Sequence, residues 1–309
     1  MSRNRLKSQS MNLDLFLKSK LLNGWGLFGL IAGPICFVII VESIAADLRT
    51  GAGVSEMIGF SVRIAVPFIY LVVAASSVHA LFPSSFSRWW LRNRKYLGLC
   101  FAVAMAWQAT FIYIMSNFYR DYYYQDVYLL RDEIEGSAGY IFLVAMVVTS
   151  FPLGRGLINR SQWKLLHTFG IYFLWAYPFS VYWWLLYYYE SASPLDYVYY
   201  WAGFIAVALR ITAWGKKRER AEKHIALKFL GITLIATGIT ASATGLLWQK
   251  TMTEFITTPT WSADLVLWLP FWPFEPFLPL FLIGLGTMTL TSSKKHADSR
   301  ASSPQTTQL

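Results

Sequence analysis

The chain has 309 residues, of which 55% are hydrophobic and only 14% are charged. A soluble protein of this length would need more charge to cover its surface, so the composition excludes an ordinary soluble globular protein. The net charge of +10 does not indicate nucleic-acid binding, because the basic residues lie at the ends of apolar blocks rather than along one polar face.

Apolar blocks of the length that a bilayer demands, roughly 20 residues, recur along the chain. They predict an all-α integral membrane protein with about eight transmembrane helices. The fourth and the last blocks are the shortest. In chain order the predicted spans are Trp25–Ala46, Ile58–Phe82, Tyr96–Phe118, Ala138–Gly154, Leu165–Leu186, Leu195–Trp214, Ile225–Trp248 and Phe274–Leu290.

These spans divide the chain into five parts. A cytoplasmic N-terminal segment, 1–24, precedes a six-helix membrane domain, 25–214. A basic cytoplasmic loop, 215–224, leads to two additional membrane helices, 225–291. The tail, 292–309, is polar and rich in small residues, so it is expected to be disordered.

The charges of the connecting segments alternate along the chain. With eight spans, every segment rich in Lys and Arg falls on one side of the membrane, including the loop with Lys216, Lys217 and Arg218. The loops on the other side are acidic or rich in tyrosine, such as RDYYYQDVYLLRDEIEG. Because basic loops stay in the cytoplasm, the pattern predicts that both termini are cytoplasmic.

Two stretches have structural interpretations. GITLIATGITASATG, within the seventh span, is rich in small residues and predicts close packing between helices. WLPFWPFEPFLPLFL, Trp268 to Leu282, has four prolines at three-residue intervals and cannot be regular helix throughout. Its Glu275 is interpreted as an interfacial carboxylate.

Histidines are few, and two of them are candidates for a site. His224 ends the basic loop and His296 lies in the tail, where both are expected to be solvated. His79 ends the second span and His167 begins the fifth. Ligating side chains inside membranes are costly, so these two are site candidates, although each is also consistent with a simple interfacial hydrogen bond.

Two blocks carry a resemblance. RWWLRNRKYLGLCFAVAMAWQATF is an arginine-rich loop that runs into an aromatic-rich helix. GYIFLVAMVVTSFPLGRGLINRSQWKLLHTFGIY contains a glycine-started helix, the pair Thr149 and Ser150, a short loop and a W-x-x-L-H motif that ends at His167. In this order they resemble the ferric-reductase-like transmembrane domain family, including its MsrQ/YedZ-like branch. The resemblance covers roughly residues 58–184.

The resemblance implies b-type haem held between the third and fifth helices by imidazoles. Carried over residue by residue, the ligands fall at Gln108, His167 and Ser180. An amide or a hydroxyl is a poor axial ligand, so we expect the outer haem site to be lost. We expect no bound cofactor and no metal; the alternative is a haem b held by His79 and His167.

Two functions from different classes follow from these residues. The first is a non-catalytic membrane protein with a ferric-reductase-like domain that has lost haem-based electron transfer and acts as a structural or interaction partner. The second is a haem b electron-transfer subunit with rearranged ligands. The expected partners are the lipid bilayer and a membrane or cytoplasmic redox protein, and the expected location is a bacterial inner membrane.

One buried ion pair is also predicted. Glu42 lies about 17 residues into the first span and Arg63 about five residues into the second, which runs back across the membrane, so their depths coincide within a ~30 Å core. An unpaired charge at that depth is expensive, so the two side chains are expected to face each other.

Thermal unfolding of the variants Glu42→Gln and Arg63→Gln tests this pair. If the side chains interact, the double variant should lose less stability than the sum of the two single variants, with a coupling of about 0.5–3 kcal/mol. A double variant that loses the full sum would exclude the pair.

Overall fold

The computed structural model describes residues 16–220 and 225–292. Most of the predicted N-terminal segment, His224, His296 and the predicted disordered tail lie outside these residues. The chain forms two compact units, which are described separately. Within the described residues, unit 1 contains 16–179 and 263–272, and unit 2 contains 180–262 and 273–292.

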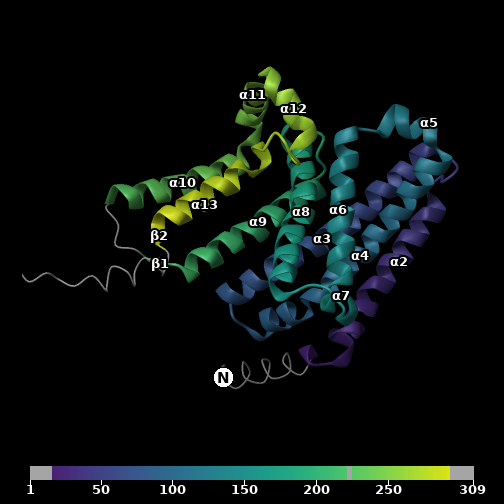
Figure 1. The fold of residues 1–309 in the computed structure, drawn as a ribbon, viewed down its shortest axis with the longest axis horizontal. Coiled ribbons are helices and arrows are strands. Elements are labelled where there is room, and N and C mark those ends of the chain that lie inside the picture. The colour runs from purple at the N-terminus through teal and green to yellow at the C-terminus, as the bar shows by residue number, and fades with distance from the viewer. Residues whose placement is uncertain (1–15, 221–224, 293–309) are drawn as a thin grey trace, which may run out of the picture. The chain divides into compact units, whose positions relative to one another are not determined.

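Unit 1 is a bundle of helices (Figure 1). It begins with a single 3-10 turn, η1 (Lys20–Leu22), and three long helices follow: α2 (Trp25–Ala45), α3 (Gly51–Leu81) and α4 (Ser85–Phe118). A short helical turn, α5 (Arg120–Tyr122), and a π-helical segment, η2 (Tyr123–Val127), come next. The last three helices are α6 (Leu130–Val148), α7 (Pro152–Gly156) and α8 (Arg160–Tyr187).

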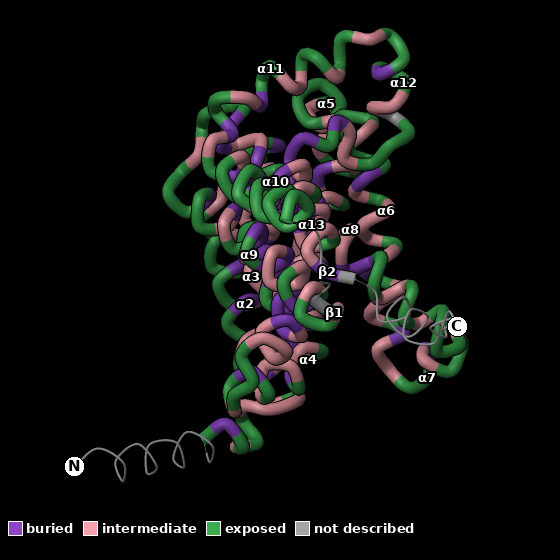
Figure 2. The backbone as a smooth tube through the Cα atoms, turned by 90° about the vertical axis from the view of Figure 1, so that its left-hand side faces the viewer, coloured by how far each residue is buried: buried purple, intermediate pink, exposed green. Residues whose placement is uncertain are grey.

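Helices α3 and α4 form the hairpin at the centre of unit 1. Pro83 follows the end of α3, and Ser84 caps α4 by accepting a hydrogen bond from the Ser87 N–H. In return the Ser87 hydroxyl accepts one from the Ser84 N–H. Such a reciprocal cap satisfies backbone donors that a helix start leaves unpaired. Many residues of α3 are buried, including Val54, Met57, Ala65 and Val73, and buried residues also occur on other helices (Figure 2).

The chain before α2 is tied to α4 by polar contacts. The buried Asn93 accepts a hydrogen bond from the Gly24 N–H and donates one to Asn23 Oδ1. The indole N–H of Trp89 donates to the Leu22 carbonyl. Buried polar groups need such partners, so these contacts fix where α2 starts.

Every one of the eight predicted segments contains a helix, but their suitability for the membrane differs. Among the described residues, four helices are long and apolar enough to cross a bilayer: α2, α3, α4 and α10 (Ile225–Ala243). Helices α6, α8 and α9 (Pro194–Lys217) have 19, 28 and 24 residues, but none of them contains a stretch of 18 residues that is sufficiently apolar and low in charge. The last, α13 (Leu278–Leu290), has only 13 residues. The structure therefore supports an all-α membrane protein with four candidate spans.

Unit 2 is organised around α13, which packs against α9 and α10. Beside them lie α11 (Gly245–Thr257), the 3-10 turn η3 (Glu275–Phe277) and two short strands, β1 (Glu219–Arg220) and β2 (Thr291–Ser292), which pair antiparallel. Small residues allow the close approach of α10 and α13: a Cβ on Gly238 would lie 2.5 Å from the Pro279 carbonyl oxygen. The predicted role of the small-residue stretch is confirmed.

The end of α10 is held by two tyrosines. The Ser242 carbonyl accepts hydrogen bonds from the Tyr187 and Tyr200 hydroxyls, at 2.7 and 2.9 Å. The last carbonyls of a helix have no partner within the helix, so these two donors satisfy an acceptor that would otherwise be costly to bury. Tyr200 is fully buried.

The region after α10 departs from the sequence prediction. The predicted seventh span, to Trp248, is interrupted, because α10 ends at Ala243 and α11 begins at Gly245. The stretch that follows was expected to be a loop, but it contains α11 and α12 (Thr260–Trp268). The proline-rich stretch is irregular as predicted, and Phe271 within it has a φ of 63°. Its Glu275 is fully buried, so the interpretation of this residue as an interfacial carboxylate is wrong.

The α10–α13 contact predicts the outcome of a single-methyl change. Gly238→Ala should destabilise the protein by about 1–3 kcal/mol, because the new Cβ meets backbone atoms that cannot move aside. Gly284→Ala on α13 is the matched control, since its Cβ would meet nothing within 4 Å. Thermal unfolding in detergent compares the two, and equal midpoints would contradict the packing.

Candidate functional site

The three ligand positions carried over from the family resemblance have different surroundings. Gln108 lies in unit 1, where its Oε1 accepts a hydrogen bond of 2.8 Å from the Tyr140 hydroxyl. Ser180 lies in unit 2 and is buried. Neither carries an imidazole, so the residues at these two positions do not fit haem iron.

Both candidate histidines belong to unit 1, and each contacts a hydroxyl group. The Nε2 atom of His167 lies 3.1 Å from Thr149 Oγ1, and the ring stacks on Trp163 at 4.3 Å. The Nδ1 atom of His79 lies 3.1 Å from Ser87 Oγ. Each histidine therefore has the hydrogen-bond partner that the simpler interpretation requires. Coordination of a haem by His79 and His167 together stays a prediction.

Glu42 and Arg63 lie on neighbouring helices of unit 1. Both have exposed side chains. In a membrane-spanning bundle an exposed side chain faces either lipid or a neighbouring helix. A charged side chain in such a position needs a partner of opposite charge. The ion pair between them stays a prediction.

Unit 1 contains a cavity of about 260 Å³ lined by residues of α3, α4, α6 and α8 and of the η2 segment. Its position follows from helical spacing, because the residues that α4 contributes lie three or four apart and share one face. The walls are mostly apolar. They are formed by Ile58, Val62, Ala65, Val66, Phe101, Met105, Gln108, Ile112, Met115, Tyr123, Val127, Tyr128, Leu129, Asp132, Glu133, Glu135, Gly136, Gly139, Tyr140, Leu143, Phe173, Leu174, Tyr177 and Pro178.

The cavity is elongated and has a polar end. Its lining runs along α6 from Asp132 to Leu143, about 16 Å at helical rise. The carboxylates lie at the start of α6, next to the η2 segment. The Gln108–Tyr140 hydrogen bond lies part of the way along, and the far end is apolar.

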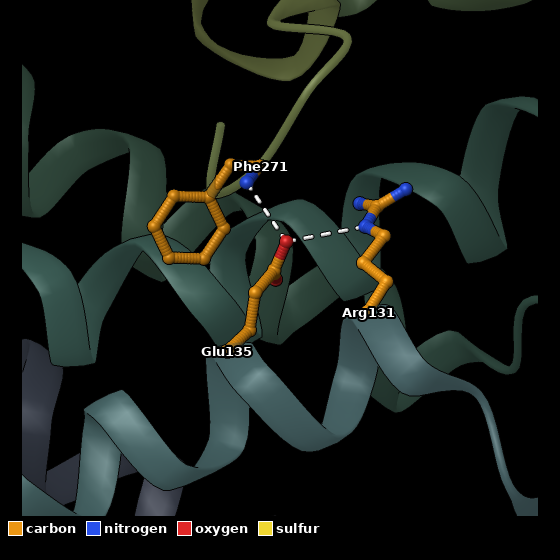
Figure 3. Close-up of polar contacts among 3 residues, drawn as sticks. All are labelled: Arg131, Glu135 and Phe271. Atoms are coloured by element: carbon orange, nitrogen blue, oxygen red, sulfur yellow. Dashed lines mark hydrogen bonds and ion pairs between the residues drawn. The ribbon is translucent and has the colours of Figure 1, made fainter. Parts of the chain in front are cut away.

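Glu135 is the buried carboxylate of this site (Figure 3). It is only 5% exposed, and its Oε1 accepts hydrogen bonds from the Arg131 Nε–H, at 3.1 Å, and the Phe271 N–H, at 2.9 Å. Within the described residues, its second oxygen, Oε2, accepts no hydrogen bond. A carboxylate oxygen that accepts no hydrogen bond from the protein is able to bind a donor that enters the cavity.

A second contact holds the polar end together. The Tyr123 hydroxyl donates a hydrogen bond to Glu133 Oε2. Burial, with this hydrogen bond as a further cause, raises the pKa of Tyr123 above its usual range. Tyr123 therefore remains protonated at neutral pH, and η2 stays attached to α6 through a donor that does not titrate.

This site is not among the residues predicted from the sequence, although the sequence contains a signal for it. The acidic and tyrosine-rich segment is predicted only as a loop that sets orientation. Glu133, Gly136 and Tyr140 follow one another at intervals of three and four residues, which places a carboxylate, a gap and a phenol on one face of α6. The contact with Phe271, 136 residues away, left no sequence signal.

Comparison of the chain with protein-family models, with characterised proteins and with solved structures gives no match.

Proposed function

We propose that this chain is an integral membrane protein in which unit 1 binds a small amphiphilic molecule, and that it acts as a structural or interaction partner rather than as a haem enzyme. The observation that carries the proposal is the cavity. Concave, mostly apolar sites with a few convergent polar groups are where proteins bind small molecules. Here those groups are Glu135, Gln108 and Tyr140.

The cavity also bears on the family resemblance. Gln108, which stands at the position of a haem ligand in that family, lines the cavity and is hydrogen-bonded to Tyr140. A ferric-reductase-like bundle that has exchanged an imidazole for a neutral hydrogen-bonding pair would keep a hollow between its helices without keeping the iron chemistry. The rearranged haem protein remains the alternative.

The proposal includes the finer topology of eight spans with cytoplasmic termini, in a bacterial inner membrane. Its support is the alternation of loop charge, together with the lengths of α6, α8 and α9, since 19 residues of helix measure about 28 Å. The segment Glu275–Leu290 would be the eighth span.

Cysteine labelling tests the topology. In a background without Cys36 and Cys100, a cysteine at Lys217 should react with an impermeant thiol reagent only after the cells are opened. A cysteine at Asp126 should react in intact cells, because its segment lies on the opposite side. Labelling of the Lys217 site from outside would contradict the proposed orientation.

A cavity-filling variant tests the binding function. A Cβ on Gly136 would meet nothing within 4 Å and Gly136 lines the cavity, so Gly136→Leu is the variant chosen to reduce the cavity volume. Leucine also has a helix propensity roughly 1 kcal/mol better than glycine. We expect Gly136→Leu to remain folded and to lose the rise in thermal midpoint that six-carbon amphiphiles give the wild type.

Gly59→Leu is the matched control, because its Cβ is also unobstructed but the residue lies outside the cavity. It should respond to amphiphiles as the wild type does. A wild type that responds to no amphiphile, or a Gly136→Leu variant that responds fully, would refute the binding function. An absorption spectrum accompanies the test: a Soret band lost in both His79→Ala and His167→Ala would favour the haem alternative.

A further inference from the structure

The polar end of the cavity carries an uncompensated negative charge. Its lining includes Asp132, Glu133 and Glu135, and none of the described lining residues is Lys, Arg or His. Arg131 pairs with Glu135 but does not line the cavity. With that one charge offset, the polar end retains a surplus of about two negative charges, three carboxylates less one guanidinium.

Part of this acidity has a local explanation. Asp132 and Glu133 lie in the first turn of α6, where carboxylates stabilise a helix through its dipole. Both are also exposed. Glu135 differs, because it lies beyond the first turn, is 95% buried and keeps one oxygen without a donor from the described residues. Arg131 and the Phe271 N–H both bond to Oε1, which leaves Oε2 able to accept a further donor.

The aromatic residues around the carboxylates suit one class of partner. Tyr123, Tyr128 and Tyr177 line the cavity near its polar end. The faces of phenol rings attract cations, and several rings around one ammonium form the site that recognises quaternary ammonium groups. A neutral or anionic head group would gain no cation–π attraction from the rings, and an anionic one would also be repelled by the carboxylates.

We infer that the ligand of this cavity is an organic cation with an apolar body. This inference rests on the proposed binding function. The ammonium group lies among Asp132, Glu133 and the free oxygen of Glu135, within the tyrosines. The apolar body extends along α4 and α6, past the Gln108–Tyr140 pair, toward Phe101 and Leu143. The length of the lining, about 16 Å, suits a single chain or ring system.

Calorimetry with three probes of equal length tests the charge preference. The full-length protein in maltoside micelles is titrated with hexyltrimethylammonium, hexanol and hexanoate. We expect the cation to bind at least about tenfold more tightly than hexanol and hexanoate to bind most weakly, because charge-assisted contacts exceed neutral ones. The Gly136→Leu variant in the same micelles corrects for partition into detergent.

Charge-removing variants assign the effect to residues. Glu133→Gln and Glu135→Gln should each weaken hexyltrimethylammonium about fivefold or more and leave hexanol within about twofold. Asp126→Asn is the matched control, since Asp126 lies in η2 but does not line the cavity, and it should change neither. If Glu135→Gln proves unstable because Arg131 loses the negative charge with which it pairs, the Glu133→Gln result decides.

The outcomes separate this inference from the function on which it rests. If hexanol or hexanoate binds as tightly as the cation and Gly136→Leu abolishes binding, the cavity binds ligands but the cation assignment is wrong. If no probe binds, the binding function fails as well. Dihexanoylphosphatidylcholine carries the same ammonium group and shows whether the ligand is a lipid or a free organic cation. If it binds more tightly than hexyltrimethylammonium, the ammonium belongs to a lipid head group. If it binds more weakly, the ligand is a free organic cation.

Discussion

The shape of unit 1 depends on how a buried carboxylate is satisfied. Glu135 Oε1 accepts two hydrogen bonds, and one of them comes from the Phe271 N–H in a segment far along the chain. Phe271 adopts a φ of 63°, which is unfavourable for a bulky residue by roughly 1–2 kcal/mol. Its ring packs on Phe173 at 5.0 Å. The hydrogen bond and the ring contact together hold a backbone conformation that the segment would not adopt alone.

The same constraint governs polar groups elsewhere in the protein. An apolar bundle offers no water to an unpaired carbonyl or amide, so each must find a partner inside the protein. In unit 1, Tyr140 satisfies Gln108 across two helices. In unit 2, Tyr187 and Tyr200 satisfy the last turn of α10. The high tyrosine content therefore supplies donors within the core as well as contacts at its edges.

Helix positions could be predicted from the sequence, whereas the candidate site could not. Trp25 begins the first helix as expected, because the apolar block starts there. Helix α4 begins at Ser85, well before the predicted Tyr96, because the cap at Ser84 outweighs the charges that follow it. The helices after Gly245 were missed because threonines and charges break the apolar pattern. The cavity requires contacts between distant residues, which periodicity does not encode.

The distance between Glu135 and Phe271 has a consequence for the order of assembly. A chain is made from its N-terminus, so the contact of Glu135 with Arg131, four residues away, is available as soon as α6 forms. The Phe271 donor follows only 136 residues later, after α8, α9 and α10 have been synthesised. During biosynthesis all residues that line the cavity are therefore made before the Phe271 donor, and a chain that stops before residue 271 has a complete α6 whose buried carboxylate still lacks its backbone donor.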